Sequence, residues 1–221
     1  MKCYIKDYPR PQFMRTDWEN LNGTWDFGFD DENAGEKEKW YQEFKGDKKI
    51  NVPFTYETKL SGIQDETRHD FIWYHRTINV DGVKLENNRY ILHFEGSDFI
   101  TKVWVNGAYA GSHRGGYARC SFDVTNLVHD GENELTVKVE DSFDTQQPRG
   151  KQRWINENFG CWYVQTTGIW KTVWSEYVPK ISLASVKMTP DLQNAALKLE
   201  YEVAAAEKDL DDDLMITATV S

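Results

Sequence analysis

The fold of this chain is decided by residues 90–128, which read YILHFEGSDFITKVWVNGAYAGSHRGGYARCSFDVTNLV. Short runs of alternating apolar and polar residues are interrupted here by turn residues at regular intervals, a pattern typical of β-strands. Between two of these runs lies Asn106-Gly107, the dipeptide most favoured in two-residue hairpins, because both central positions need positive φ. The stretch therefore predicts an antiparallel β-core with strands at 90–95, 99–105, 108–112 and 120–124.

The flanking sequence predicts further strands of the same all-β domain. Three aromatic residues alternate within 25–29, so they form one face of a strand. Residues 71–80 (FIWYHRTINV) and 134–140 (ELTVKVE) form two more strands, and a last one lies within 161–177. The charged run at 30–39 is expected on the solvated surface, because charged side chains are rarely buried unless they are paired.

The amino-acid composition changes after Pro179. Residues 181–221 contain a single aromatic residue, Tyr201, and three predicted strands at 181–188, 196–203 and 214–220. Three strands cannot bury both faces of a sandwich by themselves. We therefore predict one complete β-domain at 1–179, followed at 180–221 by the start of a second one.

Composition and charge exclude several classes of function. The net charge of −10 at pH 7 leaves no basic surface for nucleic acid. No apolar stretch reaches the ~20 residues that span a membrane. Cys3, Cys120 and Cys161 form no CxxC pair, and no leader-like segment follows Met1, so we expect a cytoplasmic location. No residue spacing fits a metal site or a cofactor site.

Aromatic residues are abundant, with nine Trp, eleven Tyr and eleven Phe. Most are expected in the core, because their rings fit the pleated surface of a sheet. A few are available for stacking on sugars, since each ring offers an apolar face and, in Trp and Tyr, a polar edge.

Six motifs in this order resemble the N-terminal region of family 2 glycoside hydrolases, the β-galactosidase, β-glucuronidase and β-mannosidase group. They are LNGTWDF at 21–27, WYHR at 73–76, VWVNG at 103–107, HRGGY at 113–117, FDVT at 122–125 and TGIWKTVW at 167–174. The resemblance covers roughly residues 9–178. It implies an all-β fold: a jelly-roll β-sandwich like galactose-binding domains, followed by a truncated immunoglobulin-like β-sandwich.

The same resemblance implies a catalytic (β/α)₈ barrel elsewhere in the intact protein. Such a barrel needs about 250 residues and usually carries both catalytic glutamates, so we expect this chain to be a non-catalytic N-terminal fragment. The dipeptides Asn133-Glu134 and Asn156-Glu157 match the family's Asn-Glu pair only superficially, because they lie in a turn and a loop. The intact protein is expected to be a retaining glycosidase for β-linked sugars, most simply β-galactosidase-like.

Two other functions stay open for the chain. One is a stand-alone carbohydrate-binding module, and the other is a purely structural or oligomerisation domain. The expected partners are a carbohydrate substrate, the protein's own barrel and, in a homo-oligomer, other copies. No cofactor is expected.

Loops of the jelly-roll domain reach the barrel's active-site pocket in the resembled family, and this chain has two long loops at 61–70 and 141–160. Their charged groups offer directional hydrogen bonds to sugar hydroxyls, and a Trp offers a stacking face. The candidate substrate-binding residues are His69, Asp70, Arg149, Lys151 and Trp162. Trp162 stands where some β-galactosidases carry an acidic sugar-binding residue, which leaves the identity of the sugar open.

These loops also have a simpler interpretation. An Arg–Asp pair on a solvated loop contributes little to stability, and the loops would then carry no function. His93 and His113 lie in strand or turn contexts and are expected to be structural.

Overall fold

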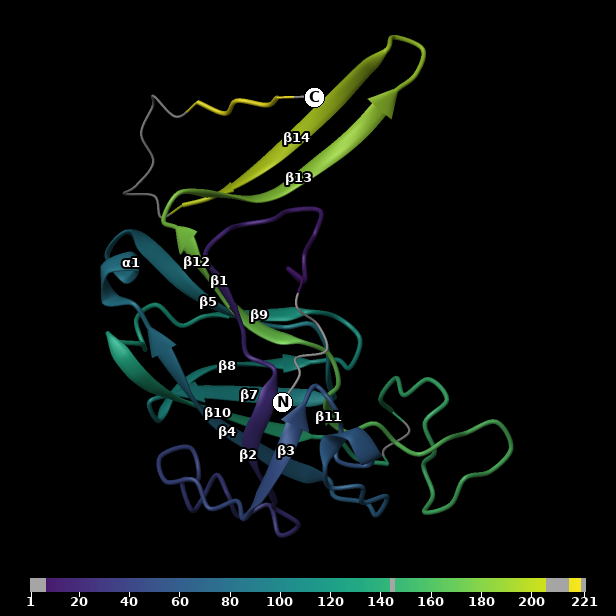
Figure 1. Cartoon of the computed structure of the whole chain (residues 1–221). Helices are drawn as coiled ribbons and strands as arrows, with labels where there is room; N and C mark the ends of the chain where they lie inside the picture. The colour runs from purple at the N-terminus through teal and green to yellow at the C-terminus, as the bar shows by residue number, and fades with distance from the viewer. Residues whose placement is uncertain (1–6, 144–145, 206–214, 220–221) are drawn as a thin grey trace.

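The computed structural model describes residues 7–143, 146–205 and 215–219. Two antiparallel sheets face each other in the first part of the chain (Figure 1). The larger sheet contains β2 (Gly23–Phe29), β3 (Lys48–Val52), β4 (Phe71–Val80), β7 (Ile100–Val105), β8 (Ala108–Arg114) and β10 (Gly131–Glu140). The smaller sheet contains β1 (Trp18–Asn20), β5 (Asn88–Phe94), β9 (Cys120–Asp123) and β12 (Val173–Pro179).

The strand order is β3-β2-β4-β10-β7-β8 in the larger sheet and β1-β12-β5-β9 in the smaller one. Two short strands, β6 (Ser97–Asp98) and β11 (Gly168–Ile169), pair with each other at one end of the sandwich. A helix α1 (Gly82–Asn87) and a 3₁₀ helix η1 (Lys59–Ser61) are the helical elements of the described residues. The prediction of an all-β jelly-roll sandwich is confirmed.

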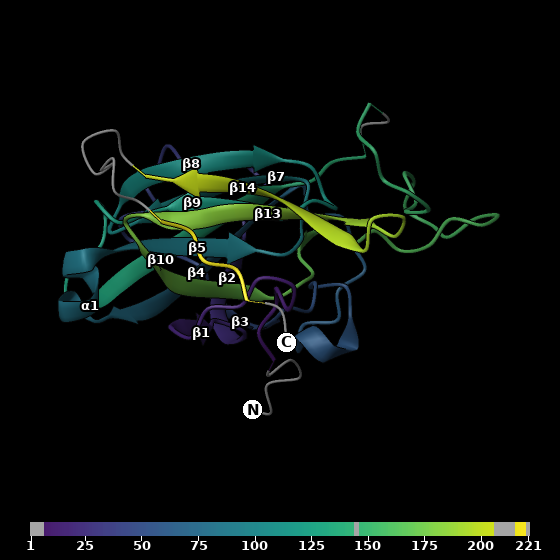
Figure 2. The same ribbon diagram turned by 90° about the horizontal axis from the view of Figure 1, so that it is seen from above.

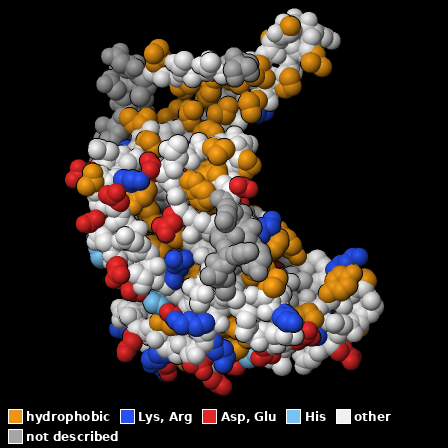
Figure 3. Space-filling model, in the orientation of Figure 1, with side chains coloured by type: hydrophobic (Ala, Val, Ile, Leu, Met, Phe, Trp, Pro, Cys, Tyr) orange, Lys and Arg blue, Asp and Glu red, His pale blue; other side chains and the backbone are white. Residues whose placement is uncertain are grey.

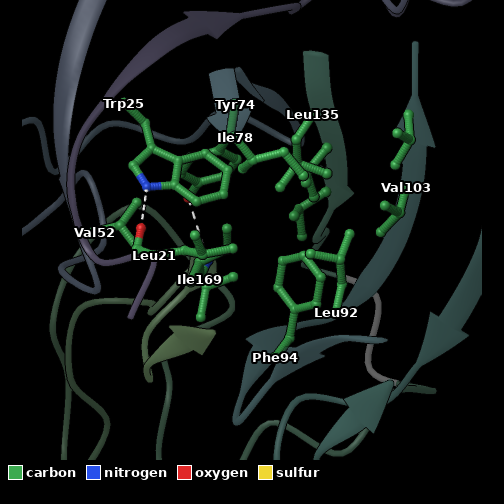
Figure 4. Packing of buried hydrophobic residues seen from close by; sticks show 14 of the residues in the cluster. Leu21, Trp25, Val52, Tyr74, Ile78, Leu92, Phe94, Val103, Leu135 and Ile169 are labelled. Carbon is green, nitrogen blue, oxygen red and sulfur yellow. Dashed lines mark hydrogen bonds between the residues drawn. The ribbon is translucent and has the colours of Figure 1, made fainter. Parts of the chain in front are cut away.

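The core lies between the two sheets and is built from alternating strand residues. Leu135, Val137 and Val139 of β10 are fully buried, as their alternation predicts. Figure 4 shows Trp25 and Tyr74 facing Leu92 and Phe94 of the other sheet. The polar atoms of both rings are satisfied inside the core: Trp25 Nε1 donates to the Leu21 carbonyl at 2.8 Å, and Tyr74 Oη accepts from the Ile169 N–H at 3.2 Å.

The hairpin at Asn106-Gly107 is confirmed, since these residues have φ of 50° and 76° and connect β7 to β8. The strands of the 90–128 stretch nevertheless divide between the two sheets. β5 and β9 pair in the smaller sheet, whereas β7 and β8 pair in the larger one. The stretch therefore crosses the sandwich at β6, and this crossing carries Asp98 to the end of the fold.

Most of the charged run at 30–39 is exposed, as predicted, but its first residue is buried. Asp30 is 4% exposed and accepts hydrogen bonds from the backbone of Ala34 and Gly35 and from the Trp73 indole. Glu36 lies 2.8 Å from the ammonium of Lys138, whose side chain is 3% exposed. The run is held against the outer face of the larger sheet because it neutralises a buried lysine there.

A separate hairpin of β13 (Ser182–Asp191) and β14 (Ala196–Ala204) follows the sandwich. Its register pairs Val186 with Tyr201 and Met188 with Leu199, which gathers apolar side chains on one face. Figure 3 shows apolar side chains concentrated in this upper part of the molecule. The two predicted strands at 181–188 and 196–203 are confirmed.

The predicted third strand at 214–220 is wrong for residues 215–219, which carry no regular structure. An alternating pattern forms a strand only where a neighbouring strand supplies hydrogen-bond partners, and within the described chain none pairs with this segment. Residues 214 and 220 lie outside the described residues, as does Cys3. The domain boundary at 179 and the immunoglobulin-like nature of the second domain stay predictions.

Candidate functional site

A cavity of about 230 Å³ opens at the end of the sandwich where β6 and β11 pair. The loop that follows β10 projects from this end, opposite α1 (Figures 1 and 2), and supplies much of the wall. The lining residues are Asp98, Tyr117, Arg149, Lys151, Gln152, Tyr163, Val164, Thr166 and Trp170.

Asp98 is the central polar group of this cavity. The residue is 3% exposed, and its Oδ2 accepts a 2.7 Å hydrogen bond from Gln152 Nε2. Its Oδ1 is buried and has no hydrogen-bond partner among the described residues. Gly116 lies against the carboxyl group, so that a Cβ at this position would overlap it. The Asp98 Oδ1 atom is therefore fixed in position and accepts no hydrogen bond from the described residues.

The environment of Asp98 favours its protonated form. Burial, and after it the charge of Asp141, raise the pKa of Asp98 to about 7, although Gln152 and Arg149 act in the opposite direction. The carboxyl group consequently changes between hydrogen-bond donor and acceptor near neutral pH.

Three aromatic residues, Tyr117, Tyr163 and Trp170, line the same cavity as this carboxyl group. Trp170 is half-buried and donates from Nε1 to the Gly116 carbonyl at 2.7 Å, which fixes the indole at the rim. Tyr117 lies edge-on to Trp170 at 6.1 Å and is 53% exposed, and Tyr163 is 62% exposed. Exposed ring faces around one fixed polar group form the combination that a sugar ring needs, with apolar C–H faces and hydroxyl edges.

Two further buried carboxyl groups, of Glu57 and Asp141, contact Thr167, the residue that follows Thr166 of the cavity wall. The Thr167 N–H donates to Glu57 Oε1 at 3.0 Å, and its hydroxyl donates to Asp141 Oδ2 at 2.9 Å. Burial raises the pKa of Glu57 to about 7 and also raises the pKa of Asp141. Burial thus favours the protonated form of both carboxyl groups.

Two of the predicted site residues, Arg149 and Lys151, line the cavity. Arg149 is 8% exposed and donates from a terminal nitrogen to the Ser142 carbonyl at 2.9 Å. Lys151 is exposed, and its carbonyl accepts from the Tyr163 N–H at 2.8 Å. The structure thus brings both residues to Asp98.

The other three predicted residues are not among those lining the cavity. The His69 ring stacks on Phe29 with centroids 3.6 Å apart, and its Nδ1 lies 2.7 Å from Asp31 Oδ1. Asp70 forms a short ion pair with Arg68, the Arg–Asp surface pair of the simpler interpretation. Trp162 stacks on Phe159 with centroids 5.2 Å apart, within an aromatic cluster that includes Trp154.

The two long loops are nevertheless neighbours, although many residues separate them in sequence. A terminal nitrogen of Arg153 donates to the Glu66 carbonyl at 2.5 Å, and Gln165 Nε2 donates to the Thr67 carbonyl at 3.3 Å. A second cavity of about 530 Å³ lies between the loops. The predicted site residues do not include Asp98, Tyr117 and Trp170, which line the first cavity.

No group of three or more His, Cys, Asp or Glu residues within the described residues is arranged to hold a metal ion. Over the same residues, no helix is long and apolar enough to cross a membrane. His93 is buried, stacks on Trp174 and lies 3.1 Å from Glu176.

A sequence profile of a known protein family matches the part of the chain that contains this cavity. The sequence profile described as "Glycosyl hydrolases family 2, sugar binding domain" matches residues 18–174. The chain belongs to glycosyl hydrolase family 2. The matched region of this family 2 domain includes the larger sheet, the Asp98 cavity and the smaller sheet up to the start of β12, and it ends before the β13–β14 hairpin.

Relatives with curated descriptions align with the family 2 chain over most of its length. A putative β-glucuronidase of Formosa agariphila is 32% identical over 143 residues, which is 63% of this chain and 16% of that protein. A β-galactosidase of Thermoanaerobacter pseudethanolicus is 25% identical over 216 residues, which is 94% of this chain and 26% of that protein. The chain spans about a quarter of the length of these relatives or less.

Solved structures of β-glucuronidases share the fold of the family 2 chain. One from Ruminococcus gnavus, in complex with D-glucuronic acid, has a TM-score of 0.71 at 18% identity and covers 88% of this chain and 36% of that one. A β-glucuronidase from an uncultured Clostridium sp. has a TM-score of 0.67 at 25% identity. The match covers 86% of this chain and 34% of that one.

Proposed function

We propose that this chain is the non-catalytic sugar-binding part of a retaining glycoside hydrolase that cleaves β-linked sugars, most simply a β-galactosidase-like enzyme. The observation that carries the proposal is the Asp98 cavity. A buried carboxyl oxygen without a partner among the described residues lies there among exposed aromatic rings. Membership of family 2 and the descriptions of the relatives as β-galactosidases and β-glucuronidases support it.

In this proposal the chain binds and positions a sugar, and the reaction takes place elsewhere. Asp98 Oδ1 accepts a hydrogen bond from a sugar hydroxyl, and the Tyr117 and Tyr163 rings cover the apolar face of the sugar. Arg149 and Lys151 hold the mouth of the cavity. A barrel of the same protein supplies the two catalytic glutamates, and copies of the intact protein assemble into a homo-oligomer.

The remaining predicted residues have different parts in this proposal. His69 and Asp70 hold the 61–70 loop in place through Phe29, Asp31 and Arg68. Trp162 lies on the projecting loop, where its aromatic cluster with Phe159 and Trp154 is suited to contact the barrel.

A titration of the chain with galactose, glucose and glucuronic acid, followed by NMR, tests the proposal. We expect the indole N–H signal of Trp170 to shift at millimolar sugar, and Asp98→Ala to weaken binding by about tenfold or more, because a buried hydrogen bond is lost. Asp47→Ala is the matched control, since this carboxylate is 79% exposed. If no sugar moves any signal of the cavity at millimolar concentration, the domain is structural and the proposal fails.

A further inference from the structure

Three successive residues at the start of β13 each accept a hydrogen bond from a different arginine. The pairs are Arg89 with the Ser182 hydroxyl at 3.2 Å, Arg15 with the Leu183 carbonyl at 2.8 Å and Arg10 with the Ala184 carbonyl at 3.3 Å. Arg89 lies near the start of β5, whereas Arg10 and Arg15 belong to residues 7–17, the N-terminal segment before β1. Figure 1 shows this segment, in purple, reaching from the sandwich toward the start of β13.

The hairpin offers acceptors at this point because its strand pairing is irregular. The register pairs Leu183 with Val203 and Ser185 with Glu202, so that Ala184 is the extra residue of a bulge. A bulged residue is left out of the hydrogen-bond ladder. A two-stranded sheet also leaves one edge of each strand without a neighbouring strand. Donors from outside the hairpin are therefore needed here, and arginine side chains supply them.

Arg15 is anchored to the sandwich by Glu176 of β12. This carboxylate is 2% exposed and accepts from one terminal nitrogen of Arg15 at 3.0 Å, while the other terminal nitrogen donates to the Leu183 carbonyl. The Tyr8 hydroxyl donates to the same carboxylate at 2.9 Å, and the Tyr8 ring lies edge-on to Trp174 with centroids 5.1 Å apart. One planar guanidinium thus connects a buried carboxylate of the sandwich to the backbone of the hairpin.

One aromatic ring holds both guanidinium groups of the N-terminal segment. The Cζ atoms of Arg10 and Arg15 lie 4.7 Å and 5.0 Å from the centroid of the Phe13 ring. Cations are attracted to the face of an aromatic ring, and this attraction offsets part of the repulsion between the two like charges. The contact restricts both side chains, so that they meet the hairpin in a defined arrangement.

Apolar packing does not fill the junction between the sandwich and the hairpin. Among the described residues, the hydrophobic core of the sandwich and the residues packed against it include none of β13 or β14. A cavity of about 450 Å³ lies between the N-terminal segment, the end of β12 and the start of β13. The direction of the hairpin therefore depends on the polar contacts of the three arginines.

We propose that the N-terminal segment is a clamp that fixes the orientation of the β13–β14 hairpin relative to the sandwich, with Arg15 as its bridging residue. This role goes beyond the proposed function, because it concerns how the sandwich is joined to the hairpin and not how a sugar is bound. Arg15 is not among the residues that line the Asp98 cavity. In the intact protein, where the predicted second domain begins with this hairpin, the clamp orients that domain relative to the cavity.

Residual dipolar couplings of the backbone amides, measured by NMR on the whole chain in a weakly aligning medium, test this inference. In the wild-type chain we expect the strands of the sandwich and of the hairpin to report one common alignment. Arg15→Lys keeps a charge for Glu176, but its single ammonium cannot bridge two partners as the planar guanidinium does. We expect the hairpin couplings of this variant to fall by about half or more, while the couplings of the sandwich stay unchanged, because the hairpin then reorients by a hinge motion.

A second variant and a control make the test independent of any loss of folding. Arg10→Gln leaves every partner of Glu176 in place and should lower the hairpin couplings by a smaller amount, since only the contact with Ala184 is lost. Arg68→Lys is the matched control, because Arg68 also pairs with a carboxylate and lies over a Phe ring, but on the 61–70 loop. It should leave the hairpin couplings at their wild-type values. If the sandwich couplings change in Arg15→Lys, Arg10→Gln alone decides.

Two results would overturn the clamp. One is a hairpin that aligns separately from the sandwich in the wild-type chain, and the other is wild-type hairpin couplings in both Arg15→Lys and Arg10→Gln. The proposed function fails or stands separately from the clamp. If Arg15→Lys loosens the hairpin and no sugar shifts Trp170, the clamp stands and the proposed function fails.

Discussion

Asp98→Asn should flatten the dependence of stability on pH. The pKa of Asp98 is about 7 in the folded chain and about 3.9 for an aspartate in an unfolded chain. Between these pH values the folded state holds a proton that the unfolded state has lost. The free energy of unfolding therefore falls as the pH rises through this window, and the loss is complete above the folded pKa. Asparagine keeps an oxygen for Gln152 and cannot ionise.

The size of the effect follows from the same two pKa values. Between pH 5 and pH 8 the folded state of the wild-type chain releases almost all of the Asp98 proton, whereas the unfolded state has little left to release. Integration over this range gives roughly 2–3 kcal/mol of stability lost because of Asp98 alone. Glu57 and Asp141 add to the slope in both proteins, since burial raises their pKa values too, so the difference between the two curves reports Asp98 together with its electrostatic interaction with Asp141.

Urea denaturation of both proteins at pH 5, 6, 7 and 8 measures this difference. We expect the advantage of Asp98→Asn over wild type to grow by roughly 2–3 kcal/mol across the series. Asp47→Asn, on an exposed carboxylate, should run parallel to wild type. Parallel curves for Asp98→Asn and wild type would refute the argument, because they would mean that Asp98 is already ionised at pH 5.

Three other substitutions test the fold. Gly168→Ala should lower the free energy of unfolding by roughly 2–4 kcal/mol, because φ is 92° there and a Cβ would overlap Tyr74 Oη. An unchanged midpoint of urea denaturation would show that the strands can move apart. Gly107→Ala should lower the free energy of unfolding by about 1 kcal/mol, because alanine disfavours the positive φ of this hairpin position. Thermal unfolding measures the loss, and an unchanged melting temperature would mean that the turn changes type. Glu176→Ala should cost roughly 3–5 kcal/mol, because the carboxylate, 2% exposed, binds Arg15, His93 and Tyr8. Limited proteolysis should then cut before β1, whereas uncut protein would show that other contacts hold this segment.

The strands were predictable because their signal is local. Residues 71–80 are rich in aromatic and β-branched residues and form β4 with the same bounds, and Asn106-Gly107 adopts the positive φ values that its chemistry favours. The pattern at 214–220 shows the limit of this reasoning. Its sequence also favours a strand, yet residues 215–219 form none, because no described neighbour completes the hydrogen bonds.

The candidate site was predictable only as a pair of loops. Arg149 and Lys151 reach the Asp98 cavity as part of the predicted loop, whereas His69 stacks on Phe29 and Asp70 pairs with Arg68. Nothing in the sequence around Asp98 shows that this acid is buried, since its burial depends on Gly116 and Gln152.

The sequence by itself determined the all-β class, most of the strands and the hairpin, because these depend on alternation and turn chemistry within a few residues. The family was indicated by the resemblance of six motifs, at 21–27, 73–76, 103–107, 113–117, 122–125 and 167–174. Only the tertiary structure decided which polar groups are functional candidates. The burial of Asp98, the raised pKa of Glu57 and the position of Arg15 between the sandwich and the hairpin arise from contacts between distant segments. Desolvation depends on all neighbours in space, and it therefore appears only once the loops have packed together.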